Sequence, residues 1–177
     1  MGKRSEFDRN ERDYYRTFDR KAVSPLVKHL PYDVCFTEPF CGDGALIGNI
    51  VDHLPKAKVI SCSDIHPLIS GADVCDYKDA TYFSDSFVIS NPPRNRKILH
   101  EAIDFYWNLW ESRNITTFLL WDANWLWTKQ AKPYYSKIEY VIPVGRVKWI
   151  EDSKMSAKDD CCWYKIGGYD SEIRIVE

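Results

Sequence analysis

The sequence has no long hydrophobic run, since its longest apolar stretches, such as residues 118–121, are only as long as a strand. A helix that spans a bilayer needs about 18 apolar residues, so no membrane span and no membrane partner are predicted. With only 8 Gly, 9 Pro and 6 Cys in 177 residues, the chain fits neither a collagen-like protein nor a disulfide scaffold. No apolar segment follows the charged N-terminal residues, so we expect no secretory signal.

The cysteines also lack the spacing of a metal site. No Cys-x-x-Cys pair occurs, and no His lies at metal-ligand spacing from a pair of cysteines, so no metal is predicted. We expect reduced thiols that pack as small hydrophobic side chains, which is typical of a cytoplasmic protein, or of the host cytoplasm if the chain is viral. The six positions are Cys35, Cys41, Cys62, Cys75, Cys161 and Cys162.

Neither sign of charge is in large excess, because 24 Lys and Arg stand against 26 Asp and Glu. The overall charge therefore does not favour a strong nucleic-acid binder, although local clusters remain possible sites. Hydrophobic residues make up 45% and aromatic residues 15% of the chain, which excludes a disordered protein. The length predicts one domain, over residues 15–177, preceded by a polar arm at residues 1–14.

Strand and helix patterns alternate along the chain. The first unit has a strand at residues 34–40, a glycine turn, a helix at 45–54 and a strand at 58–64. A helix at 19–30, with Pro25 in its first turn, precedes this unit, and a short strand is expected within 71–80. Later come strands at 87–90 and 116–122, a helix at 98–110, and two antiparallel closing strands at 137–147 and 161–166. This order predicts an α/β fold: a Rossmann-like, doubly wound, mostly parallel sheet with an antiparallel closing strand.

The glycine turn and a following acid indicate a cofactor site. Gly42 and Gly44 let the backbone turn tightly and approach a ligand closely. Asp64 lies about 20 residues beyond the turn, where an acid accepts the hydroxyl groups of a ribose. Glu38 beside the turn would repel a pyrophosphate and suits a cation. A cofactor with a ribose, an adenine and a positive charge is S-adenosylmethionine.

A second motif, Asn91-Pro92-Pro93, directly follows an apolar strand. In methyl transfer to a planar exocyclic amine, two acceptors on its N–H groups would stabilise the developing positive charge. The Asn91 side-chain oxygen and the Pro92 carbonyl can be these acceptors, and prolines add no competing donor. The tripeptide is therefore the predicted catalytic motif.

Together these motifs resemble the class I S-adenosylmethionine-dependent amino-methyltransferases of the adenine-N6 DNA type. Residues 121–125 and 144–150 more closely resemble the small phage-type enzymes of this group. The resemblance implies a methionine-contacting motif at residues 13–17 and an acid that meets the adenine amine, either Asp73 or its rival Asp76. The implied cofactor-binding residues are Tyr15, Thr17, Glu38, Pro39, Phe40, Gly42, Asp43, Gly44, Asp64, Ile65, Asp73 and Asn91.

The sequence departs from this family in two ways. Arg94 stands where the family has an aromatic residue that stacks on the flipped base. A guanidinium also stacks on bases, so Arg94 is either a stacking residue or a backbone clamp, with a Trp near 121–127 supplying the stack in the second case. The chain also has no room for a separate target-recognition domain. Sequence specificity would then be low, or would come from loops, from a homodimer mate or from a partner protein.

The expected substrate is nucleic acid, with adenine N6 of DNA as the first acceptor. Two other acceptors stay open, an RNA base and a protein glutamine amide. A protein that binds the cofactor but has lost catalysis is a further alternative. The predicted substrate-binding residues are Arg94, Arg96, Lys97, Trp125, Arg146 and Lys148.

Overall fold

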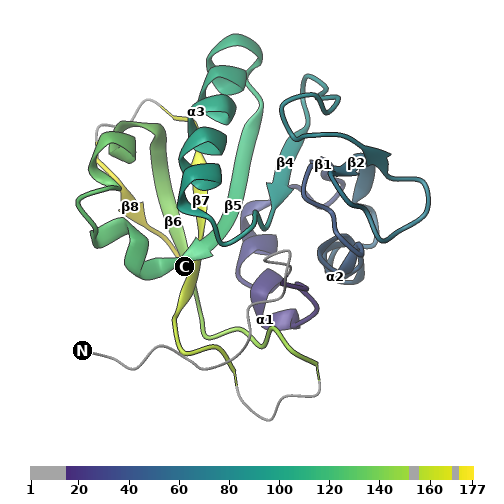
Figure 1. Cartoon of the computed structure of the whole chain (residues 1–177), viewed down its shortest axis with the longest axis horizontal. Coiled ribbons are helices and arrows are strands. Elements are labelled where there is room, and N and C mark those ends of the chain that lie inside the picture. Colours follow the sequence, from purple (N-terminus) through teal and green to yellow (C-terminus); the bar gives the residue numbers. More distant parts are fainter. Residues whose placement is uncertain (1–14, 152–155, 169–171) are drawn as a thin grey trace.

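A computed structural model describes residues 15–151, 156–168 and 172–177, so the predicted arm at residues 1–14 lies outside the described residues. Eight strands form one sheet in the order β3-β2-β1-β4-β5-β7-β6-β8 (Figure 1). The strands are β1 (Cys35–Glu38), β2 (Lys58–Asp64), β3 (Asp73–Val74), β4 (Phe87–Ser90), β5 (Thr116–Asp122), β6 (Ile138–Gly145), β7 (Cys161–Ile166) and β8 (Arg174–Ile175). The helices are α1 (Arg20–Val23), α2 (Ala45–His53) and α3 (Arg96–Arg113), with 3-10 helices η1 (Leu26–His29), η2 (Ala123–Trp127) and η3 (Lys132–Lys137).

The strand directions confirm the predicted fold class. Strands β3, β2, β1, β4 and β5 are parallel to one another, whereas β7 is antiparallel to both of its neighbours, β5 and β6. Since β6 runs in the direction of β5, the carboxyl ends of β1, β2, β4, β5 and β6 all lie at one edge of the sheet. Ligands of open α/β sheets bind at this edge.

The predicted helix over residues 19–30 is wrong as a single element. The structure divides it into α1 and η1, which flank Ser24 and Pro25. Proline has no N–H for a helical bond and clashes with the preceding turn, so the helix ends before it. The Asp19 side chain begins α1 by accepting a hydrogen bond from the Lys21 backbone N–H at 3.0 Å.

Helix α3 is longer than predicted, because both of its ends are capped. The Asn95 side chain accepts from the backbone N–H groups of Lys97 and Ile98, and Asn114 ends the helix in the left-handed conformation with φ of 53°. The short elements η2, η3 and β8 were not predicted. At 18 residues α3 is the longest described helix, and neither it nor any other described helix is apolar enough over a sufficient length to cross a membrane.

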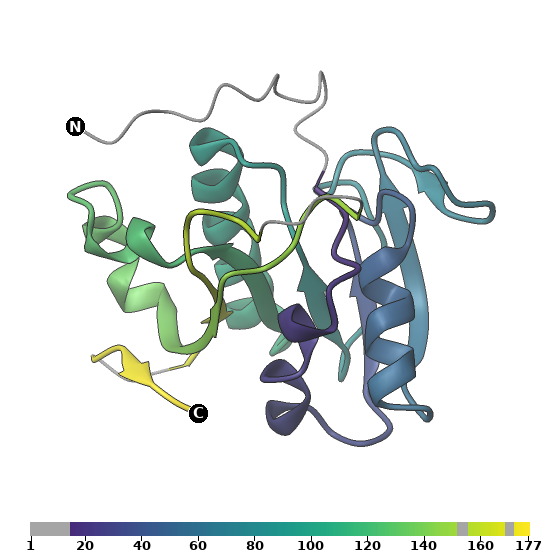
Figure 2. The ribbon, with the colours of Figure 1, turned by 90° about the horizontal axis from the view of Figure 1, so that it is seen from below.

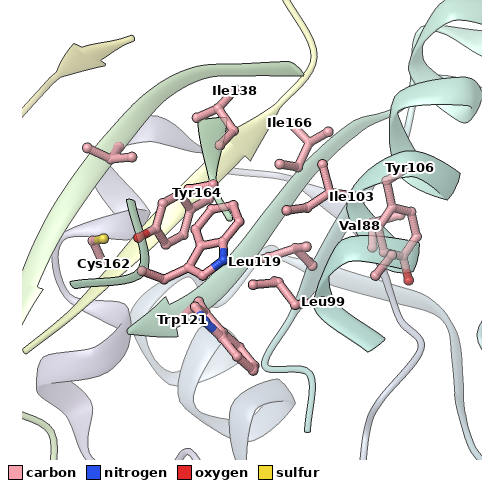
Figure 3. Close-up of a cluster of buried hydrophobic side chains, with 14 of the residues drawn as sticks. Val88, Leu99, Ile103, Tyr106, Leu119, Trp121, Ile138, Cys162, Tyr164 and Ile166 are labelled. Carbon is pink, nitrogen blue, oxygen red and sulfur yellow. The ribbon is translucent and has the colours of Figure 1, made fainter. Parts of the chain in front are cut away.

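Two hydrophobic layers cover the two faces of the sheet. Leu119 and Trp121 of β5 pack with α3 on one face (Figure 3), whereas Phe118 and Leu120 pack with α1, η1 and α2 on the other. Figure 2 shows α1 and α2 together, with α3 across the sheet from them. A central strand buried on both faces reads as a continuous apolar run, as residues 118–121 do. All six cysteines are free thiols.

Candidate active site

A cavity of about 430 Å³ lies at the carboxyl ends of β1, β2 and β4. Its volume falls within the range of small-molecule sites. Segment 15–17, the turn after β1, the ends of β2 and β4, the loop after β3 and the first turns of α3 line it. Of the residues predicted from the sequence, those that line it are Tyr15, Thr17, Glu38, Pro39, Phe40, Gly42, Asp43, Asp64, Ile65, Asn91, Pro92 and Pro93.

The glycine turn after β1 is held by Asp64 at the end of β2. One carboxylate oxygen accepts from the Gly42 N–H at 3.0 Å and the other from the His66 N–H at 2.8 Å. Gly42 and Gly44 have φ of 50° and 76°, in the left-handed region that favours glycine. Gly44 does not line the cavity but begins α2, and a Cβ there would lie 3.2 Å from Ile69. The turn therefore depends on its own glycines and on the carboxylate at the end of β2.

Asn91 is fixed by residues far from it in sequence. Its side-chain nitrogen donates to the Tyr15 carbonyl at 3.1 Å and to the Thr17 hydroxyl at 3.0 Å. The Asn49 side chain of α2 in turn donates to the Thr17 carbonyl at 2.9 Å. Because the Tyr15 carbonyl can only accept, the nitrogen of Asn91 must face it. The Asn91 side-chain oxygen is then left buried without a hydrogen-bond partner among the described residues.

The cavity carries more negative than positive charge. Arg16 pairs with Asp43, and Lys78 lies 2.7 Å from Glu101, so both cations that line the cavity are balanced by an acid. Three further acids line it, Glu38, Asp64 and Asp76. This surplus suits a positively charged ligand and disfavours a pyrophosphate.

Glu38 is the most buried of these acids, at 1% exposure. Its Oε2 atom has no hydrogen-bond partner among the described residues. Burial, together with the negative charges of Asp64 and Asp43, raises the pKa of Glu38 well above its ordinary value of 4.5. A cation in the cavity would favour the ionised form, so Glu38 is placed to respond to ligand charge.

Apolar side chains form another part of the cavity wall. Ile65 is 56% exposed although it lines the cavity, and Leu68 beside it is exposed too. The rings of Phe40 and Tyr77 pack with centroids 5.0 Å apart, and Ile98 of α3 completes this apolar wall. Uncovered apolar surface next to polar groups is typical of a site for an aromatic ring.

The two candidate acids for the adenine amine have different positions. Asp73 is exposed on β3 and does not line the cavity. Asp76 lines it, and its carboxylate accepts from the Lys78 N–H at 2.9 Å, which fixes the loop. Of the two acids, only Asp76 lies at the cavity, and which of them meets the adenine amine stays a prediction. Strand β3 ends at Val74, so Asp76 lies beyond the end of the strand.

Arg94 does not line the cavity and packs against two tryptophans. Its guanidinium carbon lies 5.1 Å from the centroid of the Trp121 ring and 4.9 Å from that of Trp149. One nitrogen donates to the Cys161 sulfur at 3.6 Å, and Nη1 is buried without a partner among the described residues. The two ring contacts leave less of the guanidinium surface for a base. In this arrangement Arg94 packs on Trp121 and Trp149, and its role as a stacking residue or as a backbone clamp stays a prediction.

The remaining predicted substrate residues lie outside the cavity. Trp125 is 1% exposed and donates to His100 at 3.2 Å, so it belongs to the core and offers no face to a base, contrary to its predicted role. Arg96 and Lys97 are exposed at the start of α3. Arg146 is exposed near Asp160, and the Lys148 N–H donates to Asp19 at 2.9 Å; both follow β6 at the same edge of the sheet. Lys148 thus ties the loop after β6 to the start of α1.

The sequence interpretation missed several residues that line the cavity. Ile98 and Glu101 are three positions apart on α3, so helical spacing after the Asn-Pro-Pro motif could have indicated them. Tyr77 follows Asp76, and its buried ring could be identified only from its contact with Phe40. The missed residues are Cys41, Ala45, Leu46, His66, Leu68, Tyr77, Lys78, Ile98 and Glu101.

Comparison with known proteins shows the fold. No protein-family model matches the sequence, and no curated protein matches it either. Solved structures do match, at low identity. The 23S rRNA methyltransferase ErmE aligns with a TM-score of 0.56 and 13% identity, over 85% of this chain and 68% of that one.

Two further structures align at a TM-score of 0.51. One is a modification subunit of a proposed type I restriction enzyme from Vibrio vulnificus, at 10% identity over 91% of this chain and 45% of that one. The other is a proposed class I S-adenosylmethionine-dependent methyltransferase from Listeria monocytogenes, at 12% identity over 89% of this chain and 62% of that one. This chain thus spans less than two thirds of either protein. Its fold is the Rossmann-like fold of class I methyltransferases.

Proposed function

We propose that this chain is an S-adenosylmethionine-dependent methyltransferase that acts on an exocyclic amine of a nucleic-acid base, with adenine N6 of DNA as the first acceptor. The side chain of Asn91 carries the proposal. Its nitrogen is committed to Tyr15 and Thr17, and its buried oxygen has no partner among the described residues. Buried polar atoms are nearly always hydrogen-bonded, so an unpartnered acceptor at a cavity supports the binding of a donor there.

The residues of the cavity fit S-adenosylmethionine. The acids Glu38, Asp64 and Asp76 provide a negative environment for its positive charges. Asp64 at the end of β2 would accept from the ribose hydroxyls, and Asp76 from the adenine amine. Ile65 and Tyr77 supply apolar surface for the adenine ring. When bound, the cofactor supplies an electrophilic methyl carbon, whose bond to sulfur breaks as a bond to the amine nitrogen forms.

The Asn-Pro-Pro motif would hold the acceptor amine. The Asn91 oxygen and the Pro92 carbonyl would each accept one N–H of the amine, which raises its electron density and stabilises the positive charge that develops on nitrogen. Pro92 and Pro93 bring no backbone N–H that could compete for these acceptors. After transfer the nitrogen would lose one proton to water.

The names of the structures that align to this chain support a nucleic-acid substrate in general, without indicating which base or which nucleic acid is methylated. ErmE is by name an rRNA methyltransferase, and the Vibrio vulnificus protein is a modification subunit of a restriction enzyme. Both names concern nucleic acid, but the low identity leaves the acceptor of this chain to experiment.

The decisive test follows transfer of a labelled methyl group from the cofactor to unmethylated DNA, RNA or protein. We expect label in DNA, as N6-methyladenine after nuclease digestion, and a rate of labelling lower by about 100- to 1000-fold with Asn91→Ala. Label in RNA or in protein would replace the proposed acceptor by one of the two alternatives. Cofactor binding without transfer to any of the three would identify a protein that has lost catalysis.

A further inference from the structure

Two segments that begin at the carboxyl edge of the sheet carry several cations and no carboxylate. They are residues 94–97, which follow the Asn-Pro-Pro motif, and residues 123–137, which follow β5. Arg94 is held between two tryptophan rings, and Lys137 pairs with Asp104. The other four cations are exposed: Arg96, Lys97, Lys129 and Lys132.

An exposed aromatic ring lies in the second segment. Trp127 is 74% exposed, whereas the preceding residues Trp125 and Leu126 are buried. A single exposed apolar residue is common on protein surfaces. Trp127 differs because Lys129 and Lys132 follow it closely and no acid lies in its segment. We call Trp127 and the four exposed cations the basic aromatic surface.

Hydrogen bonds and ring contacts join the two segments. The Arg96 side chain donates to that of Gln130 at 3.1 Å. One turn further along α3, His100 accepts from Trp125 and stacks on the ring of Tyr134, with centroids 4.7 Å apart. The helical turns of η2 and η3 accordingly lie beside α3 (Figures 1 and 2). The basic aromatic surface is therefore held together by the fold.

This surface begins next to the candidate active site. Pro93 lines the cavity, and Arg96 follows it by three residues. Ile98 and Glu101, on the same first turns of α3, line the cavity as well. Strands β4 and β5 are parallel neighbours, so the loops after them leave the sheet side by side. A single strand of nucleic acid that is bound along the surface would therefore pass close to the cavity.

The cations of the surface are largely free of acidic partners. No ion pair of Arg96, Lys129 or Lys132 is found within the described part of the chain, and Lys97 reaches Glu101 only at 3.9 Å. The nearest acids in sequence are engaged elsewhere. Asp122 caps η2 through the Asn124 N–H, Glu101 pairs with Lys78, and Glu139 pairs with Lys165 and Arg174. Cations without partners are available to phosphate groups.

We propose that the basic aromatic surface binds the single-stranded DNA segment that carries the target base. The cations contact phosphates, and Trp127 stacks on an unpaired base beside the one that enters the cavity. Stacking on an aromatic ring requires a base that is not already stacked in a duplex, which is why a single strand fits this surface. The inference rests on the proposed function, because it assumes a nucleic-acid substrate. It assigns target binding to this chain itself and not to a partner.

Fluorescence anisotropy with a labelled single-stranded DNA oligonucleotide tests the surface directly. We expect Trp127→Ala to weaken binding by about 5- to 100-fold, and Trp127→Phe to restore most of the affinity because a ring remains. The double variant Lys129→Ser/Lys132→Ser should make the slope of log affinity against log salt shallower by about 1.4, for two phosphate contacts. Duplex DNA of the same sequence should bind more weakly, with no dependence on Trp127.

A matched control lies at the opposite edge of the sheet. Tyr32 is also exposed, its ring lies 5.3 Å from the Lys56 amine, and Lys58 begins β2. Tyr32→Ala and Lys56→Ser/Lys58→Ser should leave binding and salt dependence unchanged. The proposal would be overturned if the control variants lost as much DNA affinity as the variants of the basic aromatic surface. It would also be overturned if Trp127→Ala, with an intact thermal transition, bound DNA as tightly as the unmodified protein.

The binding experiment and the methyl-transfer experiment can fail independently of each other. Binding that depends on Trp127 without any methyl transfer would support the surface and refute the catalytic proposal. If the protein methylates DNA but its DNA affinity does not depend on Trp127 or on the lysines, the catalytic proposal is supported and the basic aromatic surface is refuted. Absence of binding to any single-stranded DNA, together with transfer to protein, would refute the surface and move the acceptor to an amide.

Discussion

The side-chain nitrogen of Asn91 donates to the backbone carbonyl of Tyr15 at 3.1 Å, across 76 positions of sequence. Since Thr17 accepts a second bond from the same nitrogen, the end of β4 and the segment before α1 are fastened together at the cavity. The bonds do not involve the Asn91 oxygen. The side chain is thus oriented through its nitrogen, and its oxygen is the acceptor that the proposed function assigns to an amine.

The first prediction separates these two roles of Asn91. Asn91→Ala should lower kcat by about 100- to 1000-fold, as removal of one preorganised partner does in comparable sites. Cofactor affinity should change far less, because the acids at the other strand ends remain. Initial rates at saturating cofactor and calorimetric affinities measure the two effects.

A milder variant serves as the control for Asn91. Thr17→Val removes one of the two bonds that hold the amide and leaves the Tyr15 bond in place. We expect its kcat to fall by less than tenfold. Near-full turnover in Asn91→Ala would rule out the amine-binding role.

The second prediction concerns the acids of the cofactor site. Asp76→Ala should weaken S-adenosylmethionine binding by about 10- to 150-fold, the range for a lost hydrogen bond to a charged group. Asp64→Ala should cost at least as much, because Asp64 also holds the Gly42 and His66 N–H groups. Asp73→Ala should have no effect, since Asp73 lies away from the cavity. A calorimetric loss in Asp73→Ala that exceeds the loss in Asp76→Ala would restore the original choice.

The sequence predicted the fold well because the strands carry strong local signals. The strands at 58–64, 87–90, 116–122 and 161–166 begin and end where expected. Asp64 and Asp122 end two of these strands, and Asn91 and Gly167 directly follow the other two. The helix over 19–30 failed because its apolar spacing continues across Pro25, and backbone chemistry outweighs periodicity at that position.

The cavity was predicted less completely, for a physical reason. Residues of a recognisable motif, such as Gly42 and Asp64, could be named because turn geometry restricts their types. Tyr77 and Ile98 contribute only apolar surface, which many residue types supply equally well. The burial of Trp125 and the exposure of Trp127 differ at positions two apart in a 3-10 helix, and only packing against α3 decides between them.

The third prediction concerns Arg94. Arg94→Lys keeps the charge but cannot place a planar group between Trp121 and Trp149. We expect it to lower the free energy of unfolding by about 1 to 2 kcal/mol, the scale of cation–π contacts in partly buried sites. Chemical denaturation measures this loss, and Arg96→Lys, on an exposed side chain, is the matched control. Unchanged stability combined with weaker DNA binding would return Arg94 to the substrate site.

The fourth prediction is a pH dependence that arises from Glu38. Its pKa is raised well above 4.5 by burial and by the negative charges of Asp64 and Asp43. The folded protein therefore keeps a proton that the unfolded chain has already lost, so stability falls as pH rises from 4.5 to the folded pKa. Thermal melting of the ligand-free protein between pH 4 and 8 should show this decline, and Glu38→Gln should reduce it.

Cofactor binding should have the opposite dependence. A cation in the cavity favours the ionised form of Glu38, so binding releases a proton and affinity rises with pH across the same window. Calorimetry in two buffers of different ionisation enthalpy measures the release directly, because the observed heat then depends on the buffer. In Glu38→Gln the heat should be the same in both buffers. Identical heats in the unmodified protein, below the folded pKa of Glu38, would show that this carboxyl does not face the cofactor's charge.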